Sequence, residues 1–256
     1  MEVLILAAGY ATRLYPLTEQ RAKPLLPVGD RRLLDHLSAR LVELEGVTRW
    51  HIVANNRFHA DFVAWARQHP LAQRITVYND GTFENADRLG AIGDAEYVIR
   101  TAQIADDLLI VAGDNLFEFD LRDLRAFQLA HGSSIVTYHF PDRERLKGYS
   151  VVEVDAEGRV TSFVEKPQHP GTDLMAICCY LLSAAHVPKV SEYLSDGNNP
   201  DAPGFFIQWL HKQVPVYAFE FAGMWYDIGD LQSLTEADNE LRRRGGLPPR
   251  ECYALV

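Results

Sequence analysis

Two basic residues near the start of the chain follow a glycine turn and could hold phosphate. Residues 3–8 form an apolar run that predicts a buried strand, and Gly9 ends it. Arg13 and Lys23 come next. Turn amides can form an anion-binding concavity, to which such side chains add full charges. The pattern favours phosphate binding, although an ordinary strand-to-loop turn explains Gly9 alone equally well. The stretch contains neither Gly-Lys-Ser/Thr nor Gly-x-Gly-x-x-Gly.

Two aspartates at the ends of apolar runs are candidate metal ligands. Asp114 follows a predicted strand at 108–112, and Asp227 ends another apolar run beside Gly229. Carboxylates are hard oxygen ligands, and Mg²⁺ is commonly bound through one or two of them plus substrate phosphates. Asp114 could instead cap a helix, and we interpret Asp230 as a helix cap rather than a ligand.

The first half of the chain alternates short apolar runs with helical patterns. Strands are expected at 51–54, 75–78 and 108–112, and helices at 33–44, 58–69 and 89–101. Helices between strands imply a parallel sheet that is covered on both faces. Ligands bind such sheets at the carboxyl ends of the strands, where Gly9 and Asp114 fall.

The second half changes to closely spaced strands. They are expected at 135–140, 149–155, 159–164, 174–182, 214–221 and 224–227, with helices at 203–212 and 230–243. The whole pattern predicts an α/β fold. We expect a Rossmann-like mixed, mostly parallel sheet with helices on both faces, plus a smaller substrate-side sheet.

Composition narrows the range of partners. The chain has 256 residues and a formal net charge of −10, which argues against nucleic acid or an anionic membrane as the main partner. Its three cysteines, two of them the adjacent Cys178 and Cys179, suggest no disulfide framework. No secretory signal or membrane-spanning run is apparent, so a cytoplasmic location is expected. The possibility of a homo-oligomer stays open.

The opening motif resembles the signature of one enzyme family. Leu-Ala-Ala-Gly-x-x-Thr-Arg-Leu-x-Pro-Leu-Thr at 6–18 and Lys-Pro-Leu-Leu-Pro-Val at 23–28 are similar to sequences of the sugar-1-phosphate nucleotidyltransferases, such as the glucose-1-phosphate thymidylyltransferases. Ala11 replaces the second loop glycine of that family. Because alanine loses access to positive φ, we expect a slightly different loop path.

The resemblance implies a nucleotide site and a metal site. It assigns Mg²⁺ to Asp114 and Asp227, the β and γ phosphates to Arg13, and the α-phosphate to Lys23. The other residues that it implies for nucleotide binding are Leu6, Ala8, Gly9 and Thr12 in the opening segment, Gly90 under the base and Asn85 near the base edge.

The resemblance also implies an acceptor site. It assigns sugar hydroxyls to Glu165 and the acceptor phosphate to Lys166, whereas a Glu-Lys pair in a strand would otherwise be read as a solvated edge pair facing opposite ways. Tyr149 and Ser150 match a family Tyr-Gly step, so the serine should narrow the pocket. The turn-rich segment 196–204 could close over the acceptor or form an ordinary surface loop.

The expected activity is metal-dependent transfer of a nucleoside monophosphate from a nucleoside triphosphate to a sugar-1-phosphate, with release of pyrophosphate. The resemblance further implies a single nucleotidyltransferase domain over 1–256. In it, about 1–132 would bind the nucleotide, about 133–243 would bind the acceptor, and 244–256 would be a loose tail. The alternatives are a cytidylyltransferase for a small alcohol phosphate or phosphonate, such as phosphocholine, and a non-catalytic nucleotide-sugar sensor.

Overall fold

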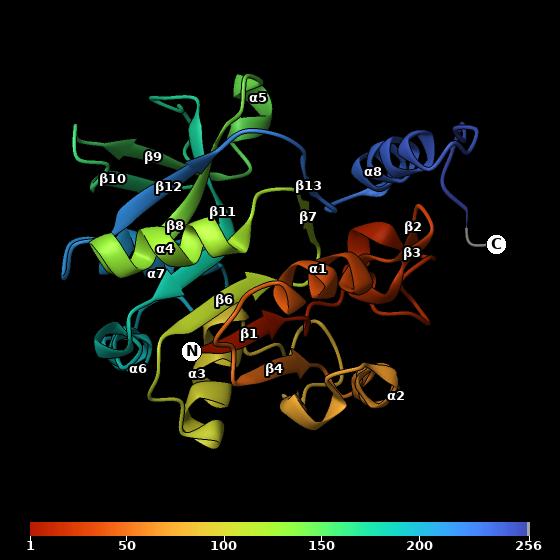
Figure 1. The fold of residues 1–256 in the computed structure, drawn as a ribbon, viewed down its shortest axis with the longest axis horizontal. Coiled ribbons are helices and arrows are strands. Elements are labelled where there is room, and N and C mark those ends of the chain that lie inside the picture. Colours follow the sequence, from red (N-terminus) through yellow and green to blue (C-terminus); the bar gives the residue numbers. More distant parts are fainter. Residues whose placement is uncertain (255–256) are drawn as a thin grey trace.

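One mixed sheet runs through the protein (Figure 1). Within residues 1–254, which the computed structural model describes, nine strands belong to it: β1 (Glu2–Leu6), β4 (Arg49–Ala54), β5 (Ile75–Asn79), β6 (Leu108–Ala112), β8 (Ser134–His139), β9 (Ser150–Val154), β10 (Val160–Glu165), β11 (Leu174–Leu182) and β12 (Tyr217–Phe221). Their order is β10-β9-β11-β6-β1-β4-β5, and β8 pairs with β11 and β12. Strands β6, β1, β4 and β5 are parallel, and β11 joins β6 antiparallel. The two halves of the chain therefore share a sheet.

Two short ribbons lie apart from the main sheet. Strand β7 (Asn115–Phe117) pairs with β13 (Trp225–Asp227), and β2 (Pro27–Val28) pairs with β3 (Arg31–Arg32). The first ribbon matters for function because it joins the segment after β6 to the segment before the last helix. It brings Asn115 opposite Asp227 although they lie far apart in the sequence.

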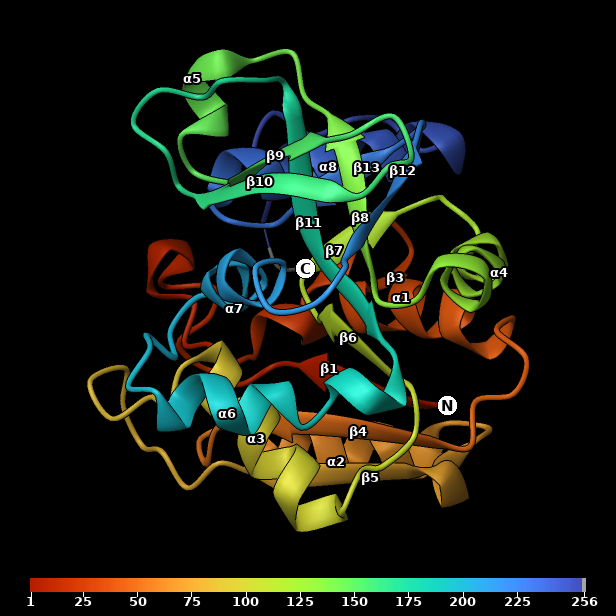
Figure 2. The same ribbon diagram turned by 90° about the vertical axis from the view of Figure 1, so that its left-hand side faces the viewer.

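Helices cover both faces of the sheet (Figure 2). The face that carries Val3 and Ile5 packs against α1 (Leu33–Val42), α2 (His59–Gln68) and α4 (Leu121–His131). The face that carries Leu4 packs against α3 (Ala91–Ala102), α6 (Lys189–Ser195) and α7 (Pro203–Leu210). Successive residues of a strand point to opposite faces, so the continuous apolar run of β1 is needed to build both layers. Helix α5 (Arg143–Leu146) stands beside β9, and α8 (Leu231–Arg244) packs on β2.

The predicted fold class is confirmed. Strands β6 and β11 occupy the predicted residues, and α8 starts after Asp230, whose carboxylate accepts a hydrogen bond from the Ser233 amide at 2.8 Å. No sequence pattern above predicts α4 or α6, because each buries few apolar side chains. Among residues 1–254, no helix has both the length and the apolar character needed to cross a bilayer.

The expectation of a loose tail is wrong for the described residues. Tyr253 is buried, and its hydroxyl donates to the Pro27 carbonyl at 2.6 Å. The Arg250 amide donates to the Asn239 side chain at 2.7 Å. An apolar ring and two hydrogen bonds therefore fix this segment against α8 and β2. Residues 255 and 256 of the expected tail lie outside the described residues.

The loop after β1 departs from the sequence expectation at Ala11. This alanine adopts the left-handed conformation, with φ 48° and ψ 43°, where a glycine would be unstrained. The prediction that Ala11 loses access to positive φ is therefore wrong. The Thr18 hydroxyl donates to the Ala11 carbonyl at 2.8 Å, and the Leu14 amide does so at 2.9 Å. These contacts hold the strained residue in place.

Ala11→Gly should stabilise the protein. Removing the Cβ relieves a left-handed penalty of about 1–2 kcal/mol, which exceeds the roughly 0.4–1 kcal/mol lost through a more flexible unfolded chain. Urea unfolding should show a net gain of about 0.5–1 kcal/mol. Ala11→Val is the opposite control and should destabilise, because a β-branched residue fits this conformation worst. A loss of stability in Ala11→Gly would contradict the strain argument.

Candidate active site

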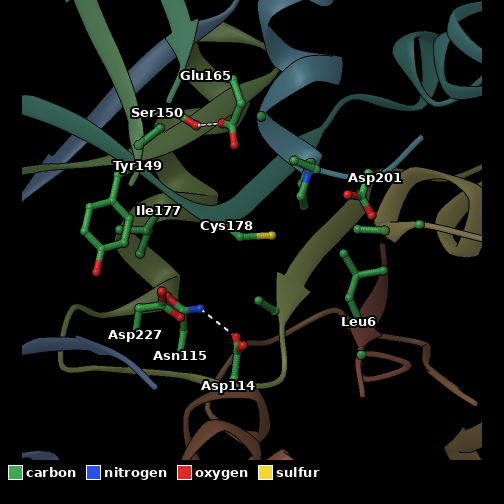
Figure 3. Close-up of a pocket in the computed structure, with 18 of the residues that line it drawn as sticks. Leu6, Asp114, Asn115, Tyr149, Ser150, Glu165, Ile177, Cys178, Asp201 and Asp227 are labelled. Carbon is green, nitrogen blue, oxygen red and sulfur yellow. Dashed lines mark hydrogen bonds between the residues drawn. The ribbon is translucent and has the colours of Figure 1, made fainter. Parts of the chain in front are cut away.

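A pocket of about 450 Å³ opens at the carboxyl ends of β1 and β6 (Figure 3). Parallel strands bring their carboxyl ends to one edge of the sheet, so this edge collects the segments that follow them. The pocket also takes side chains from β10, β11, β13 and the start of α7. The predicted site residues that line it are Leu6, Ala8, Gly9, Arg13, Gly90, Asp114, Tyr149, Ser150, Glu165, Lys166 and Asp227.

Lys23 is not among the residues that line the pocket, but it holds three segments together next to it. Its ammonium forms an ion pair with the Asp114 carboxylate and donates a hydrogen bond to the Ile228 carbonyl at 2.8 Å. The Lys23 side chain is only 16% exposed, so solvent screens this pair weakly. Lys23 thereby joins its own segment, which follows the loop after β1, to the residues just after β6 and just after β13.

Asp114 is oriented by its neighbour in the chain. The Asn115 amide nitrogen donates to Asp114 Oδ1 at 3.0 Å, and Asn115 Oδ1 accepts from the Trp225 indole at 2.8 Å. Strand β7 begins directly after Asp114, so the alternative reading of Asp114 as a helix cap is wrong. Figure 3 shows Asp114, Asn115 and Asp227 in the same part of the pocket, away from Ser150 and Glu165.

Asp227 is a carboxyl group whose surroundings raise its pKa. Burial raises its pKa to about 6, the nearby Asp114 carboxylate adds to the rise, and Lys23 and Arg13 oppose it. Gly229 lies beside Asp227 and Arg13, and a Cβ there would make only ordinary contacts with them. A Cβ on Gly229 would lie 3.7 Å from an Arg13 guanidinium nitrogen and 3.8 Å from Asp227 Oδ2. Two carboxylates and two cations therefore share one corner of the pocket.

The donor set of this corner fits a magnesium ion. Within residues 1–254, no group of three or more His, Cys, Asp and Glu side chains could enclose a metal. Magnesium does not require such a cage, because it keeps waters and substrate phosphates among its ligands. Burial and mutual repulsion raise the pKa of Asp227, which is the electrostatic situation that a divalent cation relieves.

The acceptor end of the pocket is tightly packed around Glu165. The Ser150 hydroxyl donates to Glu165 Oε2, and the Glu165 amide donates to Gln208 Oε1 at 2.9 Å. Gly204, near the start of α7, faces the same pair, and a Cβ there would overlap Glu165 Oε2 and Ser150 Oγ. Ser150 therefore occupies space that a glycine would leave open, as expected.

Lys166 does not point away from Glu165 as the strand alternation predicted. It lies just beyond β10 in the left-handed conformation, with φ 49°, and its amide donates to the Tyr149 carbonyl at 3.1 Å. The chain turns there, so Lys166 Nζ comes within 3.6 Å of Glu165 Oε1. The Lys166 side chain is 57% exposed while that of Glu165 is 6% exposed. The reading of a solvated pair on opposite faces is therefore wrong.

The segment 196–204 reaches the pocket through its last residues. The Ala91 and Ile92 amides at the start of α3 donate to the carbonyls of Asp201 and Pro200 at 3.0 and 2.9 Å. Gly90 has φ 83°, and a Cβ there would come within 2.5 Å of the Pro200 oxygen. Arg88 adds hydrogen bonds of 2.8 and 3.1 Å to the Asp201 carboxylate. This segment is thus part of the pocket wall and not an ordinary surface loop.

Two predicted nucleotide residues are not part of the pocket wall. Thr12 starts a short 3-10 helix, Thr12–Leu14, and is exposed. Asn85 is exposed in the loop before α3, where its carbonyl accepts from Arg88 at 2.9 Å. Both residues occupy the positions that the family motif predicts. Their side chains do not line the pocket, because neither residue directly follows a strand.

Asp94 lines the pocket, and sequence reasoning missed it. This aspartate is only 7% exposed, although it lies in the first turn of α3. Burial raises its pKa to about 8, and the nearby Asp80 carboxylate adds to the rise. The sequence does contain an indication: Asp94 is a charged residue among the apolar residues Ile92, Ala95 and Val98, which α3 buries.

Strand β11 supplies the back wall. Cys178 faces the pocket (Figure 3). Cys179 is buried in the apolar cluster on the other face of the sheet, because successive strand residues point to opposite faces. Ala176 and Ile177 also line the pocket. Burial raises the pKa of the Cys178 thiol well above its ordinary value, and the Asp114 carboxylate adds to the rise. The wall is therefore apolar and uncharged.

A strand-end pocket that gathers cations beside a pair of carboxylates is the arrangement expected of an enzyme that acts on nucleotides. The chain belongs to the nucleotidyl transferase family, which matches residues 2–244. The predicted membership of a nucleotidyltransferase family is thereby confirmed.

Named relatives agree with the resemblance seen in the motifs. The glucose-1-phosphate adenylyltransferase of Thermotoga neapolitana is 27% identical over 261 residues, covering 93% of this chain and 60% of the relative. That of Pseudothermotoga lettingae is 27% identical over 280 residues, covering 98% and 62%. This chain thus spans about three fifths of the length of these relatives.

A solved structure shares the fold. A crystal structure from Bacillus anthracis, assigned as a glucose-1-phosphate thymidylyltransferase in complex with sucrose, superposes with a TM-score of 0.80 at 22% identity. The match covers 94% of this chain and 95% of that one. At this identity the likeness establishes the fold of the chain.

Asp94→Asn should stabilise the protein more at pH 8 than at pH 5. The folded pKa of about 8 lies above the ordinary value of 3.8, so the contribution of Asp94 to stability is present at low pH and is lost as the pH rises towards 8. At about 1.4 kcal/mol per pKa unit, the advantage of the variant should grow by roughly 3 kcal/mol over this range.

Urea unfolding at both pH values measures this difference. Asp123→Asn is the matched control, since Asp123 is an exposed aspartate in the first turn of α4. An advantage of Asp94→Asn that stays constant with pH would mean that Asp94 is not destabilised by its burial.

Proposed function

We propose that the protein transfers a nucleoside monophosphate from a nucleoside triphosphate to a sugar-1-phosphate and releases pyrophosphate. The observation that carries this proposal is the convergence of Arg13, Lys166 and two aspartates, Asp114 and Asp227, on one pocket, with Lys23 ion-paired to Asp114. A binding protein would need the cations but not both carboxylates. The names of the relatives support the sugar-1-phosphate as acceptor.

The basic residues divide the phosphates between them in this proposal. Arg13 holds the β and γ phosphates, Lys23 neutralises the charge that develops at the α-phosphate, and Lys166 positions the acceptor phosphate. An oxygen of the acceptor phosphate attacks the α-phosphorus, and the bond to the bridging oxygen of pyrophosphate breaks. The attacking oxygen is already ionised, so positioning and charge stabilisation carry the catalysis and no strong base is needed.

Asp114 and Asp227 are the residues that would hold Mg²⁺. The ion would supply charge neutralisation to the triphosphate. Lys23 already contacts Asp114, so its ammonium and the carboxylates are positioned as one unit before substrate arrives. Asn115 keeps Asp114 oriented through the hydrogen bond described above.

Glu165 is the proposed contact for the sugar ring. An ionised carboxylate can accept hydrogen bonds from two hydroxyls. Here the Ser150 hydroxyl occupies one carboxylate oxygen, which leaves less capacity for the sugar. The acceptor is therefore a sugar-1-phosphate that need not be glucose-1-phosphate.

Three further expectations remain part of the proposal. The first half of the chain, about 1–132, would bind the nucleotide, and about 133–243 would bind the acceptor. The nucleotide loop would include the backbone of Leu6, Ala8 and Gly9. The protein would act in the cytoplasm.

A substrate panel tests the proposed function. Each of four nucleoside triphosphates is offered with a set of sugar-1-phosphates, phosphocholine and a small phosphonate, and pyrophosphate release is measured. Release with one triphosphate and a sugar-1-phosphate is the expected result. Faster turnover of phosphocholine or the phosphonate than of every sugar phosphate would favour a cytidylyltransferase instead.

Asp114→Asn and Asp227→Asn should each lower kcat by at least about 100-fold, because each removes an anionic ligand at the reacting phosphates. EDTA should abolish activity in the wild type, and added Mg²⁺ should restore it. Circular dichroism melting verifies that the variants fold. Full activity in EDTA would refute the role of the two aspartates.

Gly204→Ala should raise the KM for the acceptor and leave that for the triphosphate unchanged. The new Cβ would overlap the Glu165 carboxylate and displace it from the sugar site. Loss of a hydrogen bond to a charged group costs about 1.5–3 kcal/mol, which corresponds to roughly 10–100-fold. Gly245→Ala is the control, since a Cβ there meets only an ordinary contact 3.4 Å from the Leu241 oxygen. Equal effects of Gly204→Ala on both substrates would contradict this placement of the acceptor.

A further inference from the structure

Asp94 is a buried carboxyl group without a partner, in the wall of the pocket. Its Oδ1 atom is sealed from solvent and has no hydrogen-bond partner in the described part of the chain. Burial and the Asp80 carboxylate raise the pKa of Asp94, and no hydrogen bond or cation within residues 1–254 opposes the rise. Such a group lowers the free energy of unfolding, because the buried carboxyl loses its hydration and gains no hydrogen bond in the protein. A bound ligand that donates a hydrogen bond would supply the missing partner.

The surroundings of Asp94 select the kind of ligand. Ala8 lies in the same apolar cluster as the α3 residues Ile92 and Ala95, and Leu6 packs against that cluster. Leu6, Ala8 and Gly90 line the pocket together with Asp94. Apart from the Arg88–Asp201 pair, Asp94 is the polar side chain beside these apolar residues, and such a wall suits a planar ring with a hydrogen-bonding edge.

Charge separates this end of the pocket from the phosphate end. Arg13 and Lys23 gather around Asp114 and Asp227. Arg88, the cation of the α3 end, is already paired with Asp201 in the wall. A carboxyl group beside Asp80 and without a cation of its own offers no positive charge to a phosphate, whether or not it carries a proton. An uncharged part of the nucleotide must therefore lie against Asp94.

We propose that Asp94 reads the nucleobase of the bound triphosphate, by accepting a hydrogen bond from a ring or exocyclic N–H on the edge of the base. This inference rests on the proposed nucleotidyl transfer. It gives Asp94 the position that sequence reasoning had assigned to Asn85, whose side chain is not in the pocket wall.

The chemistry of the group fits this role. Rotation about the terminal side-chain torsion exchanges the two oxygens at little cost, so either can face the ligand. The raised pKa also lets the same carboxyl carry a proton near neutral pH, and a neutral acid offers a donor beside its acceptor. In its protonated form, the Asp94 carboxyl could thus accept a hydrogen bond from an N–H of the base and donate one to a neighbouring acceptor of the base.

The test measures kcat/KM for four nucleoside triphosphates with wild type, Asp94→Asn, Asp94→Ala and the control Asp123→Asn. Asp94→Ala should lose 10- to 100-fold with the preferred triphosphate and much less with the others, so that base preference falls. The KM for the acceptor should stay unchanged. Melting temperatures at or above that of wild type would show that the loss is not a folding defect.

Analogues of the preferred triphosphate sharpen the assignment. An analogue without the N–H, such as purine riboside for adenosine or inosine for guanosine, should be a poor substrate of the wild type. For a uracil or thymine base, the N3-methyl analogue serves. Asp94→Ala should treat the analogue and the parent base alike, because the hydrogen bond is already absent.

Several outcomes would overturn the inference. If Asp94→Ala and Asp94→Asn keep the wild-type base preference, Asp94 does not read the base, while nucleotidyl transfer stands. If instead they lose discrimination between the triphosphate and its 2′- or 3′-deoxy form, Asp94 contacts the ribose. A wild type that transfers from none of the four triphosphates would overturn the proposed function together with this inference.

Discussion

The pocket depends on one ion pair, between Lys23 and Asp114. The Lys23 ammonium also donates to the Ile228 carbonyl, so a single side chain ties three distant segments to one point. A partly buried pair of this kind contributes little net stability, because desolvation offsets the attraction. Its effect is positional: without the ammonium, the repulsion between the Asp114 and Asp227 carboxylates would have less compensation. Burial first, and this repulsion second, raise the pKa of Asp227.

Backbone strain is concentrated around the same pocket. Among the described residues, three that are not glycine have positive φ, and two of them, Ala11 and Lys166, belong to the pocket loops. Each conformation costs of the order of 1–3 kcal/mol and persists only where the surrounding contacts fix it. Gly90 adds a third left-handed turn, which lets the 200–201 backbone approach α3. The strained loop residues and the buried Asp94 therefore each lower the stability of the fold, and all of them lie at or near the pocket, whose shape they help to fix.

The sequence predicted the fold class and most of the pocket, for identifiable physical reasons. Apolar runs such as β6 and β11 are long and continuous, so their limits are visible in the sequence. Gly9 and Asp114 could be placed together because strand ends of a parallel sheet meet at one edge. The Asp230 cap could be predicted from its position before an amphipathic helix.

The remainder required three-dimensional contacts. The left-handed turn at Lys166 depends on a hydrogen bond to Tyr149, which no local pattern encodes. The closeness of Gly204 to Glu165 arises from the packing of α7 on β10. Asp94 could have been noticed as a charge on a buried helix face, but that pattern does not reveal whether the charge has a partner. Asn85 was misplaced because motif position gives the order of residues and not the direction of a side chain.

The most direct measurement of the central claim follows the α-phosphorus of the triphosphate. The protein is incubated with Mg²⁺, a sugar-1-phosphate and each triphosphate labelled at its α-phosphorus, and the products are separated. The account predicts that the label moves into a nucleotide sugar, with one pyrophosphate released for each molecule formed, and that it stays in the triphosphate when the acceptor is left out. Label that appears in free nucleoside monophosphate at the same rate with and without the acceptor would contradict it, since the pocket would then hydrolyse the triphosphate and not join it to a sugar phosphate.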